Sequence, residues 1–74
     1  MDIKRRFGLA VRARRAVLGI SQEELALRID ADQAYVSRIE AGAMNVTLET
    51  AQQVAEALEI DVAALFPVPC AGSG

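Results

Sequence analysis

The sequence predicts an all-α fold of five helices, and three observations point to it. Apolar residues recur at the i, i+3, i+4 spacing of a buried helix face, and the alternation typical of a half-buried strand does not occur. Residues that favour helix N-caps precede several of these stripes. Glycine follows two of them, where a left-handed residue commonly ends a helix. We expect one small domain over residues 1–66, followed by a flexible tail over residues 67–74 that contains Pro, Gly and Ser.

The first helix is expected over residues 2–18, with Gly19 as its stop. Ile20 can pack as a hydrophobic staple just before the next N-cap. The shared face of this helix comprises Phe7, Ala10, Val11, Arg14, Val17 and Leu18.

Two short helices are expected within residues 21–45. Ser21 can cap the first of them, with Glu24 completing a capping box. Asp32 can cap the second, which ends before Gly42. Only Asp30 and the residue after it separate the two helices, so the helices must cross at a steep angle. Their apolar stripes are Leu25, Ala26 and Ile29 in the first helix, and Val36 and Ile39 in the second.

A fourth helix is expected after Thr47, which can act as its N-cap, and a short fifth helix after Asp61. Pro67 and Pro69 would end the fifth helix, because proline cannot continue a helix interior. The apolar stripe of the fourth helix is Leu48, Ala51, Val54, Ala55 and Leu58.

The charge of the chain is unevenly distributed. Its net charge is −2, yet residues 1–40 hold all eight Lys and Arg residues against six acids, and residues 41–74 hold four acids and no base. One end of the domain could therefore face phosphates. The alternative is that the basic and acidic helices pair with each other.

The residue types argue against a catalytic or metal-binding site. The chain has no His, its single Cys70 lies in the expected tail, and its carboxylates are scattered rather than grouped for a metal. We expect no catalytic residue, no metal, no cofactor and no small-molecule substrate. No apolar run reaches the roughly 20 residues that span a membrane, and arginines interrupt any signal-peptide core. These features predict a cytoplasmic protein without a membrane partner.

Residues 7–66 resemble the lambda-repressor-like, XRE-type family of helix-turn-helix transcriptional regulators. The matching segments are S-Q-E-E-L-A from Ser21, V-S-R-I-E-A-G from Val36, N-V-T-L-E-T from Asn45, and A-E-A-L-E-I-D-V-A-A-L-F from Ala55. The order and spacing of these segments are specific to the family, although each alone is weak. The presence of Tyr35 and the N-V-T-L run also resembles the controller proteins of restriction–modification systems.

The resemblance implies two structural features. The family usually has Gly in the turn that Asp30 occupies, where the backbone adopts a positive φ that Asp tolerates better than most residues. Arg15 and Glu40 stand where the family commonly has a buried ion pair that joins the first helix to the end of the third. A solvated or phosphate-facing Arg15 is the alternative.

The resemblance also implies binding to double-stranded DNA, with the third helix in the major groove. Gln33 suits adenine and Arg38 suits guanine. The expected base contacts are Gln33, Ala34, Ser37 and Arg38. The expected backbone contacts are Gln22, Tyr35, Asn45 and Arg12. Tyr35 could equally be a half-buried packing residue, and the cations of the first helix could be a solvated face. The uncharged segment from Ala41 to Met44 lacks the cations that relatives often carry, which reduces the expected affinity and salt dependence.

A homodimer is expected, because small domains of this kind read two half-sites of a palindrome jointly. The expected interface comprises the apolar residues Val62, Leu65 and Phe66, whose alternative role is to complete the core of the monomer. A second class of function is a protein-interaction module of the same fold, of the antitoxin or anti-activator type. The acidic net charge favours that alternative, while the register of Gln22, Gln33 and Arg38 favours DNA.

Overall fold

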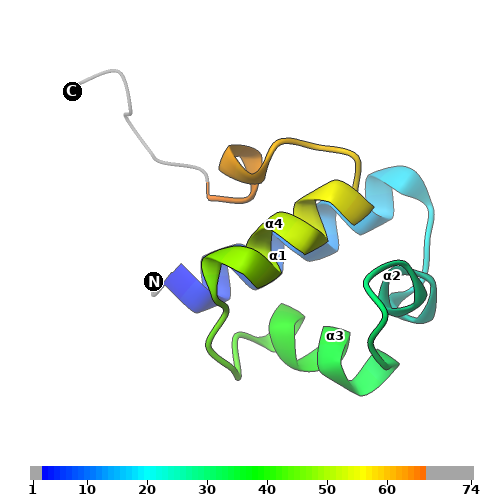
Figure 1. Ribbon diagram of the computed structural model, residues 1–74, viewed down its shortest axis with the longest axis horizontal. Coiled ribbons are helices and arrows are strands. Elements are labelled where there is room, and N and C mark those ends of the chain that lie inside the picture. Colours follow the sequence, from blue (N-terminus) through cyan, green and yellow to red (C-terminus); the bar gives the residue numbers. More distant parts are fainter. Residues whose placement is uncertain (1–2, 67–74) are drawn as a thin grey trace.

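The computed structural model of the chain describes residues 3–66, and all the secondary structure in this range is helical. Four α-helices are followed by one 3-10 turn, and the chain runs through them in the order seen in Figure 1. Their bounds are α1 Ile3–Leu18, α2 Gln22–Arg28, α3 Gln33–Ala41, α4 Leu48–Ala57 and η1 Val62–Leu65. The all-α class is confirmed, although the fifth expected helix is only a 3-10 turn. The expected tail lies outside the described residues.

The ends of the helices follow from short polar side chains and from two glycines. The side-chain oxygens of Ser21, Asp32, Thr47 and Asp61 each accept a backbone N–H, at 2.8–3.1 Å, from the residue two or three positions later. Gly19 and Gly42 take left-handed conformations with φ of 71° and 70°, directly after α1 and α3. The predicted N-caps and stops are therefore confirmed.

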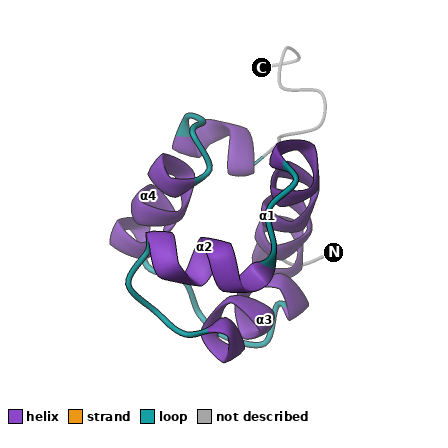
Figure 2. Cartoon of the chain, turned by 90° about the vertical axis from the view of Figure 1, so that its right-hand side faces the viewer, coloured by secondary structure: helices purple, strands orange, loops and turns teal. Residues whose placement is uncertain are grey.

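The helices enclose one small core. α3 packs mainly on α1 and α2, while η1 packs on α4 and α1. Figure 2 shows α2 crossing between α1 and α4, with α3 beneath it. The buried apolar residues are Phe7, Val11, Leu25, Ala26, Val36, Ile39, Ala51, Val54, Ala55, Leu58 and Leu65.

The contact between α1 and α3 depends on Gly8, which is buried in the middle of α1. A Cβ atom added there would lie 2.6 Å from the carbonyl oxygen of Glu40 and would also strike that of Ile39. These atoms belong to the backbone of α3, so no side-chain rotation could relieve the contact. The two helices approach this closely only because residue 8 has no side chain.

Two residues expected in apolar stripes are exposed instead. Val17 is 73% exposed and Leu48 is 85% exposed, so their predicted burial is wrong. Val17 follows Val11 by six residues, which places it about 120° around the helix from that core residue. Leu48 is the first residue of α4, and because helical side chains lean toward the N-terminus, Leu48 extends beyond the end of the helix.

The 3-10 turn completes the core of the monomer. Leu65 is 0% exposed, so the expectation that it offers an exposed apolar surface is wrong. Phe66 stacks on Phe7 of α1, with ring centroids 5.0 Å apart and planes inclined by 25°. Val62 is half-buried against the same core. The alternative role stated for this segment, completion of the monomer core, is the one that Leu65 fills.

Two arginines bind the C-terminal end of α4. Nε of Arg14 donates to the carbonyl oxygen of Leu58 at 3.0 Å, and Nη1 of Arg28 donates to that of Ala57 at 2.9 Å. Arg28 also lies 3.7 Å from a carboxylate oxygen of Glu59, whose φ is 61°. Cations are favourable at this end of a helix because of its partial negative charge. Within residues 3–66, no helix is both long and apolar enough to cross a bilayer.

Candidate nucleic-acid interface

α3 has two faces of opposite character. Val36 and Ile39 face the core with exposed fractions of 0% and 2%. Gln33, Ala34 and Arg38 are exposed, and Ser37 is half-buried between them. At about 100° per residue, the four residues of this second set lie on one side of the helix. They are the four expected base-contacting residues, and the fold presents them together on an outer face.

The turn between α2 and α3 determines the orientation of α3 relative to α2. Asp30 has a φ of 58°, so the positive φ expected at this position is confirmed. The N–H of Ala31 then donates to the carbonyl oxygen of Ala26 at 2.8 Å, which closes the end of α2. Ala26 is 2% exposed and lies on the core side of α2. A small residue there lets α2 and α3 pack closely across the four residues, 29–32, that connect them.

An ion pair joins α1 to the end of α3. Nε of Arg15 lies 2.7 Å from Oε2 of Glu40, and Nη2 of Arg15 donates to Oε1 of Glu40 at 3.1 Å. The side chains are 17% and 6% exposed, so water screens the pair weakly. The hydrogen bonds that Arg15 donates to Glu40 raise the pKa of Arg15 above its ordinary value, against the opposing effect of burial. The ion pair that the resemblance implied is present, and its two hydrogen bonds make it bidentate.

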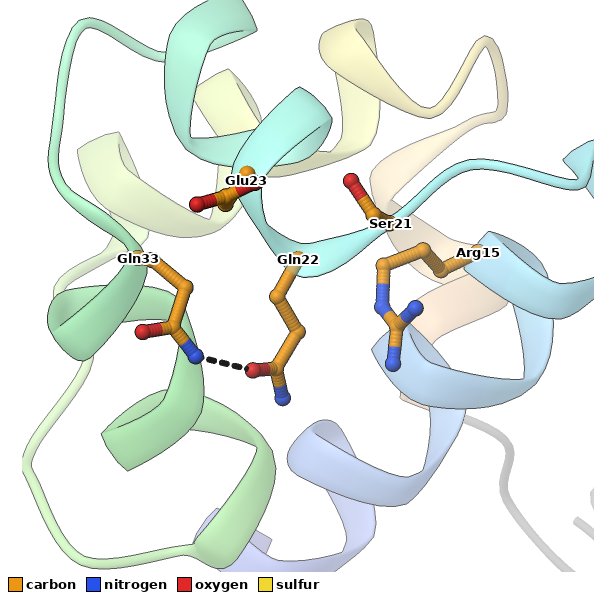
Figure 3. Close-up of a pocket in the computed structure, with 5 residues that line it drawn as sticks. All are labelled: Arg15, Ser21, Gln22, Glu23 and Gln33. Carbon is orange, nitrogen blue, oxygen red and sulfur yellow. Dashed lines mark hydrogen bonds between the residues drawn. The ribbon is translucent and has the colours of Figure 1, made fainter.

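The ion pair extends outward through two glutamines. Nε2 of Gln22, the first residue of α2, donates to Oε1 of Glu40 at 3.0 Å. Oε1 of Gln22 accepts a hydrogen bond from Nε2 of Gln33, the first residue of α3. Figure 3 shows Gln22 between Gln33 and Arg15. These side chains line an open hollow of about 460 Å³, whose lining comprises Arg15, Ser21, Gln22, Glu23 and Gln33.

The other expected backbone-contacting residues lie around this surface. Arg12 is exposed on α1, and Asn45 is exposed in the loop after α3. Neither of them lines the hollow beside Gln22. Tyr35 is half-buried and packs against the core, which is the packing role stated as its alternative. Within residues 3–66, no group of three or more acidic or thiol side chains is placed to hold a metal ion.

Comparison with known proteins identifies the family of this chain. The model of the family described as Helix-turn-helix matches residues 11–65, which is more than half of the chain. The chain belongs to the helix-turn-helix family. Its motifs are those of the XRE-type regulators in that family, and the α2–turn–α3 unit is the helix-turn-helix itself.

Three known proteins illustrate what this chain is similar to. The control protein C.MunI from Mycoplasma sp is 39% identical over 66 residues, which cover 88% of this chain and 89% of that protein. The restriction-modification controller protein C.AhdI from Aeromonas hydrophila is 39% identical with a TM-score of 0.80, over 84% of this chain and 90% of that one. The hypothetical transcription factor NHTF from Neisseria is 32% identical with a TM-score of 0.86, over 92% of this chain and 78% of that one. These relatives are named as regulators and not as enzymes.

Sequence reasoning missed two features of the helix-turn-helix surface. One is Gly8, whose signal was present, because a glycine inside a helix costs about 1 kcal/mol relative to alanine and so suggests a close contact. The other is the hydrogen bond between Gln22 and Glu40, which joins residues 18 positions apart. No spacing rule predicts a contact between the start of one helix and the end of the next.

Proposed function

We propose that this helix-turn-helix protein is a sequence-specific transcriptional regulator that binds a palindromic DNA operator as a homodimer, with α3 in the major groove. One observation carries the proposal. The outer face of α3 exposes amide, methyl and guanidinium groups, while its inner face is buried in the core. A rigid helix that presents such groups at its surface fits the width of the major groove.

The chemistry of that face suits base edges. Gln33 can pair with adenine through one donor and one acceptor, and Arg38 can donate twice to guanine. Ala34 offers a methyl group to the methyl of thymine, and Ser37 can donate or accept a hydrogen bond. We infer that these four residues select the operator sequence.

Backbone contacts would come from the rim of the same surface. Gln22 is half-buried and lines the hollow at the start of α2, and we infer that its amide contacts a phosphate. Arg12 and Asn45 are exposed on flanking elements. These groups would position α3 without selecting a sequence. Tyr35 packs against the core, so we assign it at most a minor contact with the DNA backbone.

Dimerisation would let two copies of α3 read half-sites one helical turn apart, about 34 Å. The half-buried Val62 and Phe66 remain the candidates for the contact between copies. Leu65 cannot contact a second copy directly, because its side chain is fully buried, but it supports the two residues from the core. Light scattering of Val62→Asp tests this interface, and a variant with the oligomeric mass of the parent would refute it.

A matched pair of arginine variants tests the DNA surface. Duplexes selected from a random pool by the parent protein provide the operator, and a scrambled duplex of the same length provides the reference. Arg38→Ala should lose about 1–3 kcal/mol of preference for the operator. Arg12→Ala removes the same charge from α1, so it should weaken binding to both duplexes equally and reduce the salt dependence by about one phosphate contact.

The results separate the proposal from its alternative. A parent protein that selects no common sequence, even at low salt, refutes the regulator and favours the protein-interaction module. Full operator preference in Arg38→Ala refutes the assignment of α3 as the reading surface.

A further inference from the structure

The C-terminal end of α4 is held by arginines from two other helices. Nη1 of Arg28, in α2, donates to the carbonyl oxygen of Ala57 at 2.9 Å. Nε of Arg14, in α1, donates to that of Leu58 at 3.0 Å, and its Nη2 donates to that of Glu59 at 3.4 Å. Three successive carbonyl groups are therefore bound by side chains of the two helices on which α3 packs.

The chain leaves α4 at Glu59 in a conformation that is unfavourable for a glutamate. Its φ is 61°, and the N–H of Ile60 donates to the carbonyl oxygen of Ala55 at 3.1 Å, as in a Schellman cap. Glycine is the usual residue at that place, because a Cβ atom makes a positive φ costly. The carboxylate of Glu59 lies 3.7 Å from Nη1 of Arg28. The side chain of Glu59 is 68% exposed, so this ion pair adds little stability to offset the strain.

Arg28 and Glu59 join two surfaces of the proposed function. α2 and α3 form the surface that would read DNA, while η1 carries Val62 and Phe66, the candidates for the contact between copies. Apolar packing of η1 on α4 and α1 brings the two surfaces together but is not directional. The charge-assisted bond from Arg28 to the end of α4 is directional.

The distance between these surfaces makes their relative orientation important. Figures 1 and 2 place η1 and α3 on opposite sides of α1 and α4. A small rotation of η1 relative to α2 therefore moves α3 of one copy over a larger distance relative to α3 of the other copy. A firm connection at the end of α4 limits that movement.

We propose that Glu59 and Arg28 are positioning residues that determine which spacing between half-sites the dimer accepts. This inference rests on the proposed function, in which two copies of α3 read a palindrome. One added base pair moves the half-sites apart by about 3.4 Å and turns one relative to the other by roughly 35°. A dimer with η1 held firmly cannot follow that change, whereas a dimer with η1 held loosely can. The pair thus selects spacing and not base sequence.

The first test needs no DNA. Residual dipolar couplings of backbone N–H groups, measured by NMR, report the orientation of η1 relative to α2 and α3. In the parent protein, the couplings of all three elements should fit one rigid body. In Glu59→Gly, the couplings of η1 should become smaller because η1 moves relative to α2. Couplings of η1 equal to those of the parent would overturn the inference, whatever the protein does with DNA.

The second test measures spacing preference. Duplexes carry the two selected half-sites at the parent spacing, or one base pair closer or farther apart. The ratio of dissociation constants for changed and parent spacing is measured for the parent, Glu59→Gly and Arg28→Leu. Glu59→Gly should lower this ratio on the order of fivefold, because each dimer contains the exposed ion pair twice. Arg28→Leu should lower it at least as much, since it also loses the bond to Ala57.

Asp30→Gly provides the matched control. Asp30 also has a positive φ, of 58°, and within residues 3–66 its exposed carboxylate makes no ion pair. This variant removes the same charge and the same kind of strain, but from the turn inside the helix-turn-helix. It should keep the spacing ratio of the parent. If Glu59→Gly keeps that ratio, or if Asp30→Gly lowers it equally, the inference is overturned.

Two further measurements separate positioning from a general loss of structure. Urea denaturation of Glu59→Gly should give a midpoint close to that of the parent, because relief of the positive φ offsets the lost ion pair. Base preference within one half-site should stay unchanged, because the outer face of α3 is intact. A variant that loses base preference and spacing preference to the same extent would overturn the assignment of Glu59 to spacing.

Failure of the proposed function would look different. A parent protein that selects no common sequence, or that binds its operator as a monomer, refutes the homodimeric regulator before any variant is made. Selection of spacing then fails together with it. The dipolar couplings still decide whether Glu59 and Arg28 hold η1 relative to α2 and α3.

Discussion

Replacement of Gly8 by alanine should destabilise the domain, although alanine is the better helix former. The added Cβ would lie 2.6 Å from the carbonyl oxygen of Glu40. Overpacking of this kind costs about 1–3 kcal/mol, and contact with the backbone favours the upper part of that range. The helix propensity of alanine returns about 1 kcal/mol. We therefore expect a net loss of about 1–2 kcal/mol.

Urea denaturation and thermal melting measure this loss. For a domain of this size, 1 kcal/mol corresponds to roughly 4–8 °C in Tm, so Gly8→Ala should melt about 5–15 °C below the parent. The variant should also lose operator preference, because α3 must move away from α1 and takes Glu40 with it.

Gly19→Ala provides the matched control. Gly19 has a φ of 71°, but nothing lies within 4 Å of the added Cβ. This variant should lose about 1 kcal/mol from backbone strain alone and keep the operator preference of the parent. If Gly8→Ala is as stable as the parent or more stable, the close approach of α1 and α3 is not a constraint and the reasoning fails.

Three further variants test separate features. Arg15→Met should lower the free energy of unfolding by about 3 kcal/mol, because Glu40 is left buried without its partner. Since the pKa of Arg15 is raised, the stabilisation by Arg15 is complete below the pKa of the unfolded state and is lost only at strongly alkaline pH. The decrease measured in urea titrations should therefore be equal at neutral and mildly alkaline pH. Asp30→Gly should raise the unfolding free energy by roughly 0.5 kcal/mol, because relief of the positive φ outweighs the added freedom of the unfolded chain; a lower Tm would contradict this. Leu65→Ala should lose about 2–5 kcal/mol if it is a core residue, and a midpoint equal to that of the parent would place it outside the core.

The helices and their ends could be predicted because their causes are local. A cap needs a polar side chain within three residues of the N–H that it accepts, and a stop needs a glycine at a single position. Ser21, Asp32 and Gly42 meet these conditions in the sequence alone. The positive φ of Asp30 followed from the resemblance, since the residue type itself does not require it.

Burial was harder to predict, because it depends on which helices cover which face. Val17 and Leu48 continue the apolar stripes in the sequence, yet no other helix covers α1 at Val17 or α4 at Leu48. Leu65 presents the opposite case. The sequence predicted that its segment forms an interface with a second copy, but η1 packs on α4 and α1 and places Leu65 in the core of the monomer.

The candidate site was predictable residue by residue but not as a connected unit. Its members were identified from the resemblance, and Arg15 and Glu40 were paired in the same way. The bond from Gln22 to Glu40 depends on the relative placement of three helices and on the orientation of one amide. Only the packed structure brings those together.

The stacking of Phe66 on Phe7 has a consequence for the way this chain acquires its structure. The two rings are separated by 59 positions in the sequence, and both border the same core. During synthesis from the N-terminus, the residues of α1 to α4 are made before Phe66, so the ring of Phe7 lacks its stacking partner until the end of the domain is available. Closure of the core is therefore a late, long-range event, in contrast to the fast local formation of the helices. A nascent chain halted before Leu65 should remain open to proteases that the finished domain resists.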